Sequence, residues 1–165
     1  MKAATERKEH KEKPEHHMQD IMKLCDTVRE TAYAIHVYHG HGHLEKVNEN
    51  ALVHRLREAG IQVEQQHPLT VYDEDGTVIG EYFADLLVDN RLIVELKACR
   101  AMADEHVAQV LGYLRSARSE HGLLINFGSA KFEIKKYILS EQKNRTGSRA
   151  VSLLLSFVFS VLFRG

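Results

Sequence analysis

Three charged residues stand inside an apolar stretch of the sequence, and their types and spacing are those of a site that does chemistry. Asp85, Glu95 and Lys97 lie in YFADLLVDNRLIVELKA, residues 82–98, which otherwise has the apolar and β-branched composition of two short strands. Burying a lone carboxylate is costly unless a cation or a proton accompanies it. We therefore expect a specific role for these three charges.

The turn between the two strands decides whether the carboxylates meet. A two-residue turn at Asp89 and Asn90 would put Asp85 and Glu95 on opposite faces of the hairpin. A three-residue turn over 89–91 makes one face entirely apolar and places the two acids opposite each other, with beta-carbons about 5 Å apart. Burial of the apolar face favours this second register. It pairs Val88 with Leu92, Leu86 with Val94, Ala84 with Leu96, Asp85 with Glu95 and Phe83 with Lys97.

Two carboxylates held together repel each other unless a cation or a proton intervenes. Carboxylate oxygens are ligands that Mg²⁺ and Mn²⁺ prefer, and these ions keep positions open for water and phosphate. Lys97 follows Glu95 by two residues on the same face, where its ammonium can hold a water molecule or stabilise developing negative charge. The spacing also leaves open a salt-bridged cluster at a solvated sheet edge.

Two periodicities along the chain predict the elements that must position these residues. Apolar residues recur at three- and four-residue steps in the helical segments. Between them, alternating or short apolar runs predict strands. The expected order is two helices over about 19–38 and 44–59, three or four antiparallel strands over 61–98, a helix from 104, and two strands within 121–128 and 131–139. This order predicts a mixed α/β (α+β) sheet with helices packed on it.

The two ends of the chain differ from the domain between them. Residues 1–17 are highly charged and are expected to stay solvated, whereas residues 18–140 are expected to form one domain. Residues 141–165 are expected to be a linker and an apolar tail, AVSLLLSFVFSVLF. As a helix this run is about 21 Å long, shorter than the roughly 30 Å core of a bilayer. A packed helix or strand or a homo-oligomer contact is preferred over membrane association and over a disordered or non-native extension.

Composition and charge limit the class of protein. Apolar residues make up 44% of the chain and charged residues 27%, as in ordinary soluble domains. The formal net charge of −1 gives no overall basic field, so contact with nucleic acid would depend on local clusters. Cys25 and Cys99 lack the spacing of a zinc site or a disulfide framework, and a cytoplasmic location is expected.

Local basic residues are candidates for contact with phosphates. Lys131 and Lys135 belong to a segment in which Lys and Arg outnumber Glu, and Arg100 closely follows the three charges in sequence. Such side chains can give salt-dependent binding of nucleic acid. An ordinary solvated surface is the open alternative.

Several motifs, in this order and spacing, resemble those of known nucleases. The Asp-x9-Glu-x-Lys arrangement resembles that of the PD-(D/E)XK nuclease superfamily, although Ala84 replaces the proline before the first acid, a departure that many members share. The segments GHLEKVNENAL, GEYFADLLVDNRLIVELKA, HVAQVLGYL and GLLINFG are similar to the GxxExxY protein family, which is assigned to that superfamily. Asn48 stands where that family's motif has tyrosine. The resemblance covers about residues 20–140 and implies a restriction-endonuclease-like core.

The resemblance implies further site residues. Glu45 matches the acidic residue of the first core helix, which in such nucleases ligates the metal directly or through water. Glu49, one turn later, is the competing candidate. Gln109 and Tyr113 resemble a Q-x-x-x-Y motif, in which the glutamine lies near the metal site and the tyrosine near nucleic acid. The implied metal ligands are Asp85, Glu95 and Glu45, and the implied catalytic residues are these three together with Lys97 and Gln109.

A metal-dependent nuclease that hydrolyses DNA or RNA with Mg²⁺ or Mn²⁺ is the favoured function. A catalytically inactive nuclease-fold module that binds nucleic acid or regulates a partner is the alternative, supported by the near-neutral charge and by Asn48. A membrane-associated or structural protein organised by the apolar tail is a third possibility. The tract HGHGH, residues 39–43, could bind a transition metal or could be a glycine-rich loop before the second helix.

Overall fold

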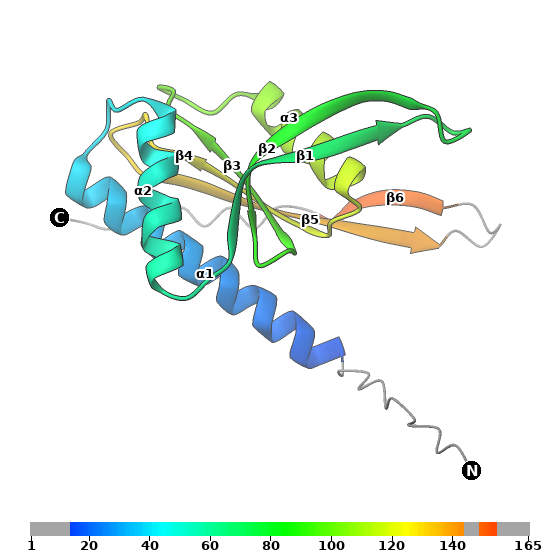
Figure 1. Ribbon diagram of the computed structural model, residues 1–165, viewed down its shortest axis with the longest axis horizontal. Helices are drawn as coiled ribbons and strands as arrows, with labels where there is room; N and C mark the ends of the chain where they lie inside the picture. Colours follow the sequence, from blue (N-terminus) through cyan, green and yellow to red (C-terminus); the bar gives the residue numbers. More distant parts are fainter. Residues whose placement is uncertain (1–13, 144–148, 155–165) are drawn as a thin grey trace, which may run out of the picture.

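A mixed six-stranded sheet with helices packed on it forms the centre of the protein (Figure 1). The computed structural model describes residues 14–143 and 149–154. In chain order the elements are α1 (Pro14–His39), α2 (Glu45–Glu58), β1 (Val63–Tyr72), β2 (Val78–Val88), β3 (Leu92–Lys97), α3 (Asp104–Ala117), β4 (His121–Asn126), β5 (Glu133–Lys143) and β6 (Arg149–Leu154). The predicted mixed α/β sheet is confirmed, with three strands between α2 and α3.

The strands lie in the sheet in the order in which they occur along the chain. Neighbouring strands pair antiparallel except β3 and β4, which are parallel and are joined through α3. A parallel connection needs a crossover of this kind because the chain must return to the end at which it started. The helix predicted after residue 104 is therefore the element that makes the sheet mixed.

The two faces of the sheet have separate apolar cores. One core joins α1 and α2 to alternate residues of the strands, including Leu86, Val94 and Leu123. The other joins α3 to Ile93, Leu124 and further strand residues. The buried apolar positions of α1 are the predicted stripe: Ile21, Leu24, Cys25, Val28, Ala32 and Ile35. Alternation of side chains across each strand thus supplies both faces with apolar surface.

The predicted end of the second helix is confirmed. Gly60 has φ 79°, a left-handed conformation that glycine adopts without a steric penalty. Its N–H donates to the carbonyl of Arg57, and the N–H of Ile61 donates to the carbonyl of Leu56. These two bonds satisfy carbonyls in the last turn of α2 and direct the chain into β1.

The three-residue turn between β2 and β3 is confirmed. Val88 pairs with Leu92 and Leu86 pairs with Val94, as the apolar face requires. Asp89 and Asn90 have φ of 51° and 56°. Aspartate and asparagine enter this left-handed region more readily than most residues, which makes the tight turn possible.

Beyond Leu86 and Val94 the predicted pairing is wrong. The ladder between β2 and β3 stops there, so the register contains none of the predicted pairs Asp85 with Glu95, Ala84 with Leu96 and Phe83 with Lys97. Ala84 pairs with His67 of β1 and packs in the α3 core, on the other face from Leu86. The β1–β2 ladder is itself interrupted beside Gln66, which has φ 52°. This interruption lets β2 leave β3 and continue with β1 as a ribbon that extends past α3 (Figure 1).

At the C-terminal end the described residues add an edge strand. Glu141 to Lys143, the start of the expected linker, continue β5, and β6 pairs antiparallel with it. Residues 144–148 and 155–165, which include most of the expected linker and apolar tail, lie outside the described residues, as do residues 1–13. None of the helices in the described part is long and apolar enough to cross a membrane.

Candidate active site

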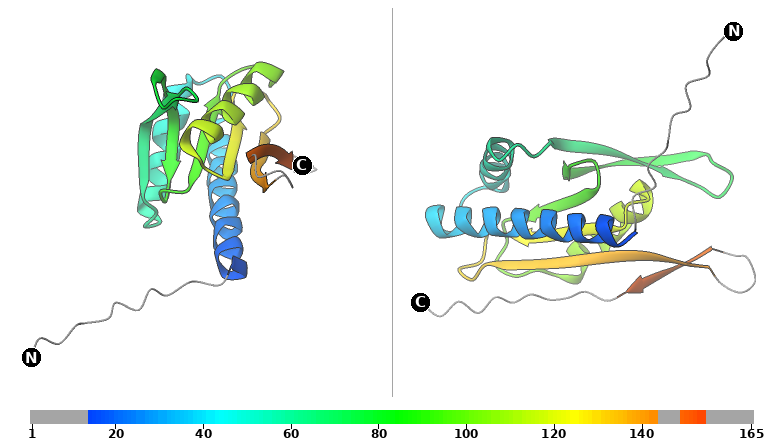
Figure 2. Two further views of the ribbon diagram at one scale, coloured as in Figure 1. Left: turned by 90° about the vertical axis from the view of Figure 1, so that its right-hand side faces the viewer. Right: turned by 90° about the horizontal axis from the view of Figure 1, so that it is seen from below.

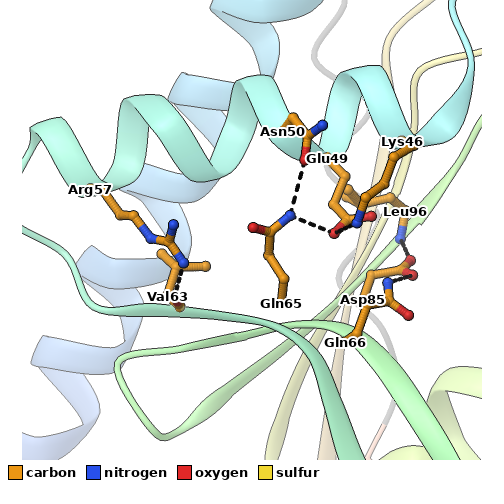
Figure 3. A network of polar contacts seen from close by, with 9 residues as sticks. All are labelled: Lys46, Glu49, Asn50, Arg57, Val63, Gln65, Gln66, Asp85 and Leu96. Atoms are coloured by element: carbon orange, nitrogen blue, oxygen red, sulfur yellow. Dashed lines mark hydrogen bonds and ion pairs between the residues drawn. The ribbon is translucent and has the colours of Figure 1, made fainter.

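Asp85 stands where the β2–β3 ladder ends, and its side chain takes the place of a backbone partner. The N–H of Leu96 donates to Asp85 Oδ2 at 2.8 Å, and Nε2 of Gln66 donates to Oδ1 at 3.3 Å (Figure 3). A backbone donor freed by the diverging strands is thus satisfied by the carboxylate. Asp85 is held between β1 and β3 by strand geometry rather than by a flexible loop.

Glu95 is a buried carboxylate on β3, with only 2% of its surface exposed. Its Oε1 accepts a hydrogen bond from Lys97 Nζ at 2.7 Å, while the buried Oε2 has no hydrogen-bond partner. Burial and the neighbouring Asp85 carboxylate raise the pKa of Glu95 to about 7, although the hydrogen bond from Lys97 lowers it. The site therefore contains a buried oxygen that lacks a donor or a cation.

Lys97 is the cation of this cluster. Its side chain is 15% exposed and forms the 2.7 Å ion pair with Glu95. Burial lowers its pKa, but the hydrogen bond to Glu95 and the negative charges of Glu95, Glu45 and Asp85 outweigh burial and leave the pKa raised. Lys97 therefore stays protonated and compensates part of the negative charge.

Glu45, the first residue of α2, shares the electrostatic environment of the strand residues. Burial raises its pKa and so does the Asp85 carboxylate, while Lys97 and a hydrogen bond from the N–H of Ala98 lower it. The N-terminus of α2 thus brings a third carboxylate to the end of β3. A helix N-terminus also stabilises an ionised acid in its first turn.

Glu49, the competing acid on α2, makes different contacts. Its buried carboxylate accepts hydrogen bonds from Lys46 at 2.6 Å and from Gln65 of β1 at 2.8 Å (Figure 3). The bond from Gln65 ties α2 to β1, and the bond from Lys46 lies within α2. Asn48, at the departing motif position, is also buried, and its Nδ2 donates to the carbonyl of Leu44 at 3.4 Å.

Helix α3 approaches the cluster from the other side of the sheet. Nε2 of Gln109 donates to the hydroxyl of Tyr113 at 2.6 Å, so the i, i+4 spacing joins the two side chains directly. Burial raises the pKa of Tyr113, and Glu95 and Asp85 raise it further. The ring of Tyr82 on β2 lies 5.6 Å from that of Tyr113. The predicted Q-x-x-x-Y pair is therefore within electrostatic range of the acids.

A family model decides the relationship of this protein. The model of the PD-(D/E)XK nuclease superfamily matches residues 22–137, from within α1 to within β5. The chain belongs to this superfamily. Comparisons with curated proteins and with solved structures gave no match. The restriction-endonuclease-like fold expected of a PD-(D/E)XK nuclease is confirmed, whereas the narrower GxxExxY resemblance stays a prediction.

Among the basic residues expected at the site of this PD-(D/E)XK domain, Lys135 shares a cross-strand row with Glu95. Glu95 pairs with Leu124 of β4, and Leu124 pairs with Lys135 of β5. Paired residues point to the same face, so Lys135 lies two strands, or about 10 Å, from Glu95 on the α3 side. Arg100 and Lys131 are exposed, in the loops after β3 and β4.

One feature of the PD-(D/E)XK domain that sequence analysis missed is a clamp on the chain after Lys97. Oδ1 of the fully buried Asn126 accepts hydrogen bonds from the N–H groups of Cys99 at 3.1 Å and Gly128 at 3.0 Å. The N–H of Phe127 donates to the carbonyl of Lys97 at 2.7 Å. A beta-carbon on Gly128 would lie 2.3 Å from the backbone of Ala98 and Cys99, so only glycine fits.

The clamp extends to the next strand, because Nδ2 of Asn126 donates to Glu133 Oε2 at 3.1 Å. Asn126 is paired with Lys97 on one side and with Glu133 on the other. The clamp could not be predicted from the segment GLLINFG, because an asparagine in an apolar run does not reveal its partners in another segment.

The described residues contain no group of three or more His, Cys, Asp or Glu side chains arranged to hold a metal ion. His39, His41 and His43 are exposed, and Nε2 of His43 contacts the carbonyl of His39 at 3.2 Å. The transition-metal interpretation of the HGHGH tract therefore has no support. Asp85, Glu95 and Glu45 are likewise not arranged as such a group in this structure.

Proposed function

We propose that this domain hydrolyses phosphodiester bonds of DNA or RNA with Mg²⁺ or Mn²⁺ bound by Asp85, Glu95 and Glu45. The observation that carries the proposal is the unpaired, buried Oε2 of Glu95 beside a second carboxylate. Such an arrangement is unfavourable for a domain that needs only stability. It is suited to a group that gains a divalent cation in its working state.

The residues present fit a hard divalent ion. Carboxylate oxygens are its preferred ligands, and Mg²⁺ in proteins commonly takes one or two carboxylates and completes its shell with water and substrate phosphate. The backbone carbonyl of Leu96, between Glu95 and Lys97, offers a further oxygen. Glu45 is favoured over Glu49 on α2, because Glu49 already accepts bonds from Lys46 and Gln65.

When bound, the ion would polarise a phosphate oxygen and lower the pKa of a water molecule. Lys97 would position the attacking water and stabilise negative charge that develops on the phosphate, since its ammonium is held by Glu95 and stays protonated. Asp85 would be oriented by the N–H of Leu96 and by Gln66, which leaves little rotational freedom to lose on binding.

Nucleic acid would reach the acids along the α3 face. Gln109 holds the Tyr113 hydroxyl, and Tyr113 would contact the nucleic acid beside the cleaved bond. Lys135, in the same row as Glu95, would neutralise a neighbouring phosphate. Arg100 and Lys131, exposed in the adjoining loops, would extend this contact.

Cleavage assays on single-stranded, double-stranded and structured DNA and RNA test the proposal. The wild type is expected to cleave at least one of these substrates with Mg²⁺ or Mn²⁺ and none with EDTA. Asp85→Asn and Glu95→Gln should abolish cleavage, because each removes a charge while keeping the shape of the side chain. Glu81→Gln is the matched control, since Glu81 is an exposed acid on the same strand as Asp85.

Two results would contradict the proposal. Equal cleavage by the wild type and Glu95→Gln would mean that a contaminant or another site does the chemistry. Binding of nucleic acid without cleavage in either metal would favour the inactive module, for which Asn48 in place of the motif tyrosine is the structural argument.

A further inference from the structure

An apolar groove lies between α1 and the β4–β5 part of the sheet, away from the acids. It has a volume of about 310 Å³ and is lined mainly by Met22, Cys25, Leu123, Ile134 and Ile138. Met22, an apolar residue of this lining, is exposed in the described structure. A groove with this lining favours an apolar occupant over a nucleotide or a phosphate.

Three charged residues, Asp26, Arg29 and Lys136, also line this groove. Asp26 and Arg29 of α1 form an ion pair at 2.7 Å, so each already has a charged partner. Nζ of Lys136 lies 2.8 Å from Met22 Sδ, which leaves the aliphatic part of Lys136 along the groove. The lining therefore has apolar surface to be covered, and the charges of Asp26 and Arg29 are paired with each other.

The register of β6 leads the chain to this groove. β6 runs antiparallel to β5 from the pair Lys143 and Arg149 to the pair Ile138 and Leu154. Ile138 is itself a lining residue of the groove. Figure 2 shows β5 beside α1, with β6 on the outer side of β5. The last residue of β6, Leu154, is thus paired with a residue that lines the groove.

The sequence that follows Leu154 has the apolar character that suits an occupant of this groove. Residues 155–163, LSFVFSVLF, contain seven apolar residues and no charge. Continuing the β5–β6 register would bring residue 158 opposite Ile134, the next groove residue of β5 on that face. Four residues of extended chain span about 13 Å, which is the distance between Ile138 and Ile134 along a strand.

We propose that residues 155–163 of the same chain cover the apolar groove between α1 and β5, with Val158 next to Ile134. The apolar tail then serves as part of the domain's core, on the side opposite the α3 face. This inference does not depend on nuclease activity.

The absence of tryptophan from the chain permits a direct test. Val158→Trp introduces a single tryptophan at the predicted contact. Its emission should be shifted to shorter wavelength than that of Tyr72→Trp, an exposed position on the β1–β2 ribbon, and the two should coincide in urea. Equal emission of the two native variants would overturn the proposal, because a covered groove must desolvate residue 158.

Cysteine labelling gives a second readout at the groove itself. In a Cys99→Ser background, Cys25, which is 5% exposed, is the only thiol. Val158→Asp should raise its alkylation rate about tenfold or more while far-ultraviolet dichroism stays native, and Arg164→Asp should not. An unchanged rate would contradict the proposal. Protection of Cys25 that increases with protein concentration would also overturn it, because a second copy would then cover the groove.

Discussion

The two halves of the β2–β3 hairpin differ in what fills the space between the strands. On the turn side three consecutive residue pairs continue the backbone ladder, and all but one of their side chains are fully buried apolar groups. On the other side the ladder stops, and the N–H of Leu96 donates to a carboxylate instead of a carbonyl. Regular pairing is present where only stability is needed, and it ends where charged side chains must be held.

The difference also explains why the charges can be buried at all. The turn side supplies apolar burial on both faces, which is the dominant favourable term in folding. Glu95, in the same short strand, loses solvation and keeps an oxygen without a partner. The charged half therefore depends on the apolar half for stability. Variants in the apolar half should mainly lower stability, and variants in the charged half should mainly lower function.

The largest expected change in stability comes from the apolar half. Leu92→Ala removes a fully buried side chain from the α1–α2 core and should lower the free energy of unfolding by about 2–5 kcal/mol. Urea denaturation measures this, with Glu81→Gln as the surface control. Protein that is still folded should bind Mn²⁺ normally, and a large loss of affinity would mean that the two halves are not separable.

Lys97→Met tests the charged half. Its expected effect is on the activation barrier of cleavage, and is similar in size to the loss in free energy of unfolding expected for Leu92→Ala. Turnover should fall by about 10²-fold, or roughly 2.7 kcal/mol in the activation barrier, because the positioned ammonium is lost. Affinity for Mn²⁺ should be retained. Single-turnover cleavage and calorimetry give the two values, and a variant with normal turnover would remove Lys97 from the mechanism.

Asn126→Asp should disturb the clamp that supports the charged half. The new carboxylate still accepts from Cys99 and Gly128, but it no longer donates to Glu133 and faces it as a like charge. The free energy of unfolding should fall by about 1–3 kcal/mol.

Adding Glu133→Gln to Asn126→Asp supplies the missing donor and should restore stability and Mn²⁺ affinity together. Thermal denaturation and calorimetry of the four members of this cycle measure the coupling. Recovery of stability without recovery of Mn²⁺ affinity would limit Asn126 to a structural role.

The smallest effect is a pH dependence of stability in EDTA. Because the pKa of Glu95 is raised from its ordinary 4.5 to about 7, the folded protein retains a proton that the unfolded chain loses. Stability from this group is therefore fully present below pH 4.5 and is lost as the pH rises to about 7, with a slope of at most about 1.4 kcal/mol per pH unit. Glu95→Gln should lack this loss, and parallel curves for both proteins would contradict the shifted pKa.

The sequence allowed the hairpin register to be predicted because a slip of one residue would have moved a whole apolar set out of the core. The Gln109 and Tyr113 pair was predictable for a similar reason, since residues four apart share a helix face. The end of the ladder was not predictable, because it depends on Gln66 in another strand having a left-handed conformation. The clamp of Asn126 on Cys99 joins segments 27 residues apart, and neither residue type indicates the other.

Calorimetric titration of Mn²⁺ into the wild type, Asp85→Ala and Glu95→Ala tests the central claim most directly, namely that the end of the ladder is a metal site. The wild type should bind one ion, and each variant should bind about tenfold or more weakly while remaining folded. Equal binding by all three proteins would contradict the account and would leave Asp85, Glu95 and Lys97 as a buried salt-bridged cluster.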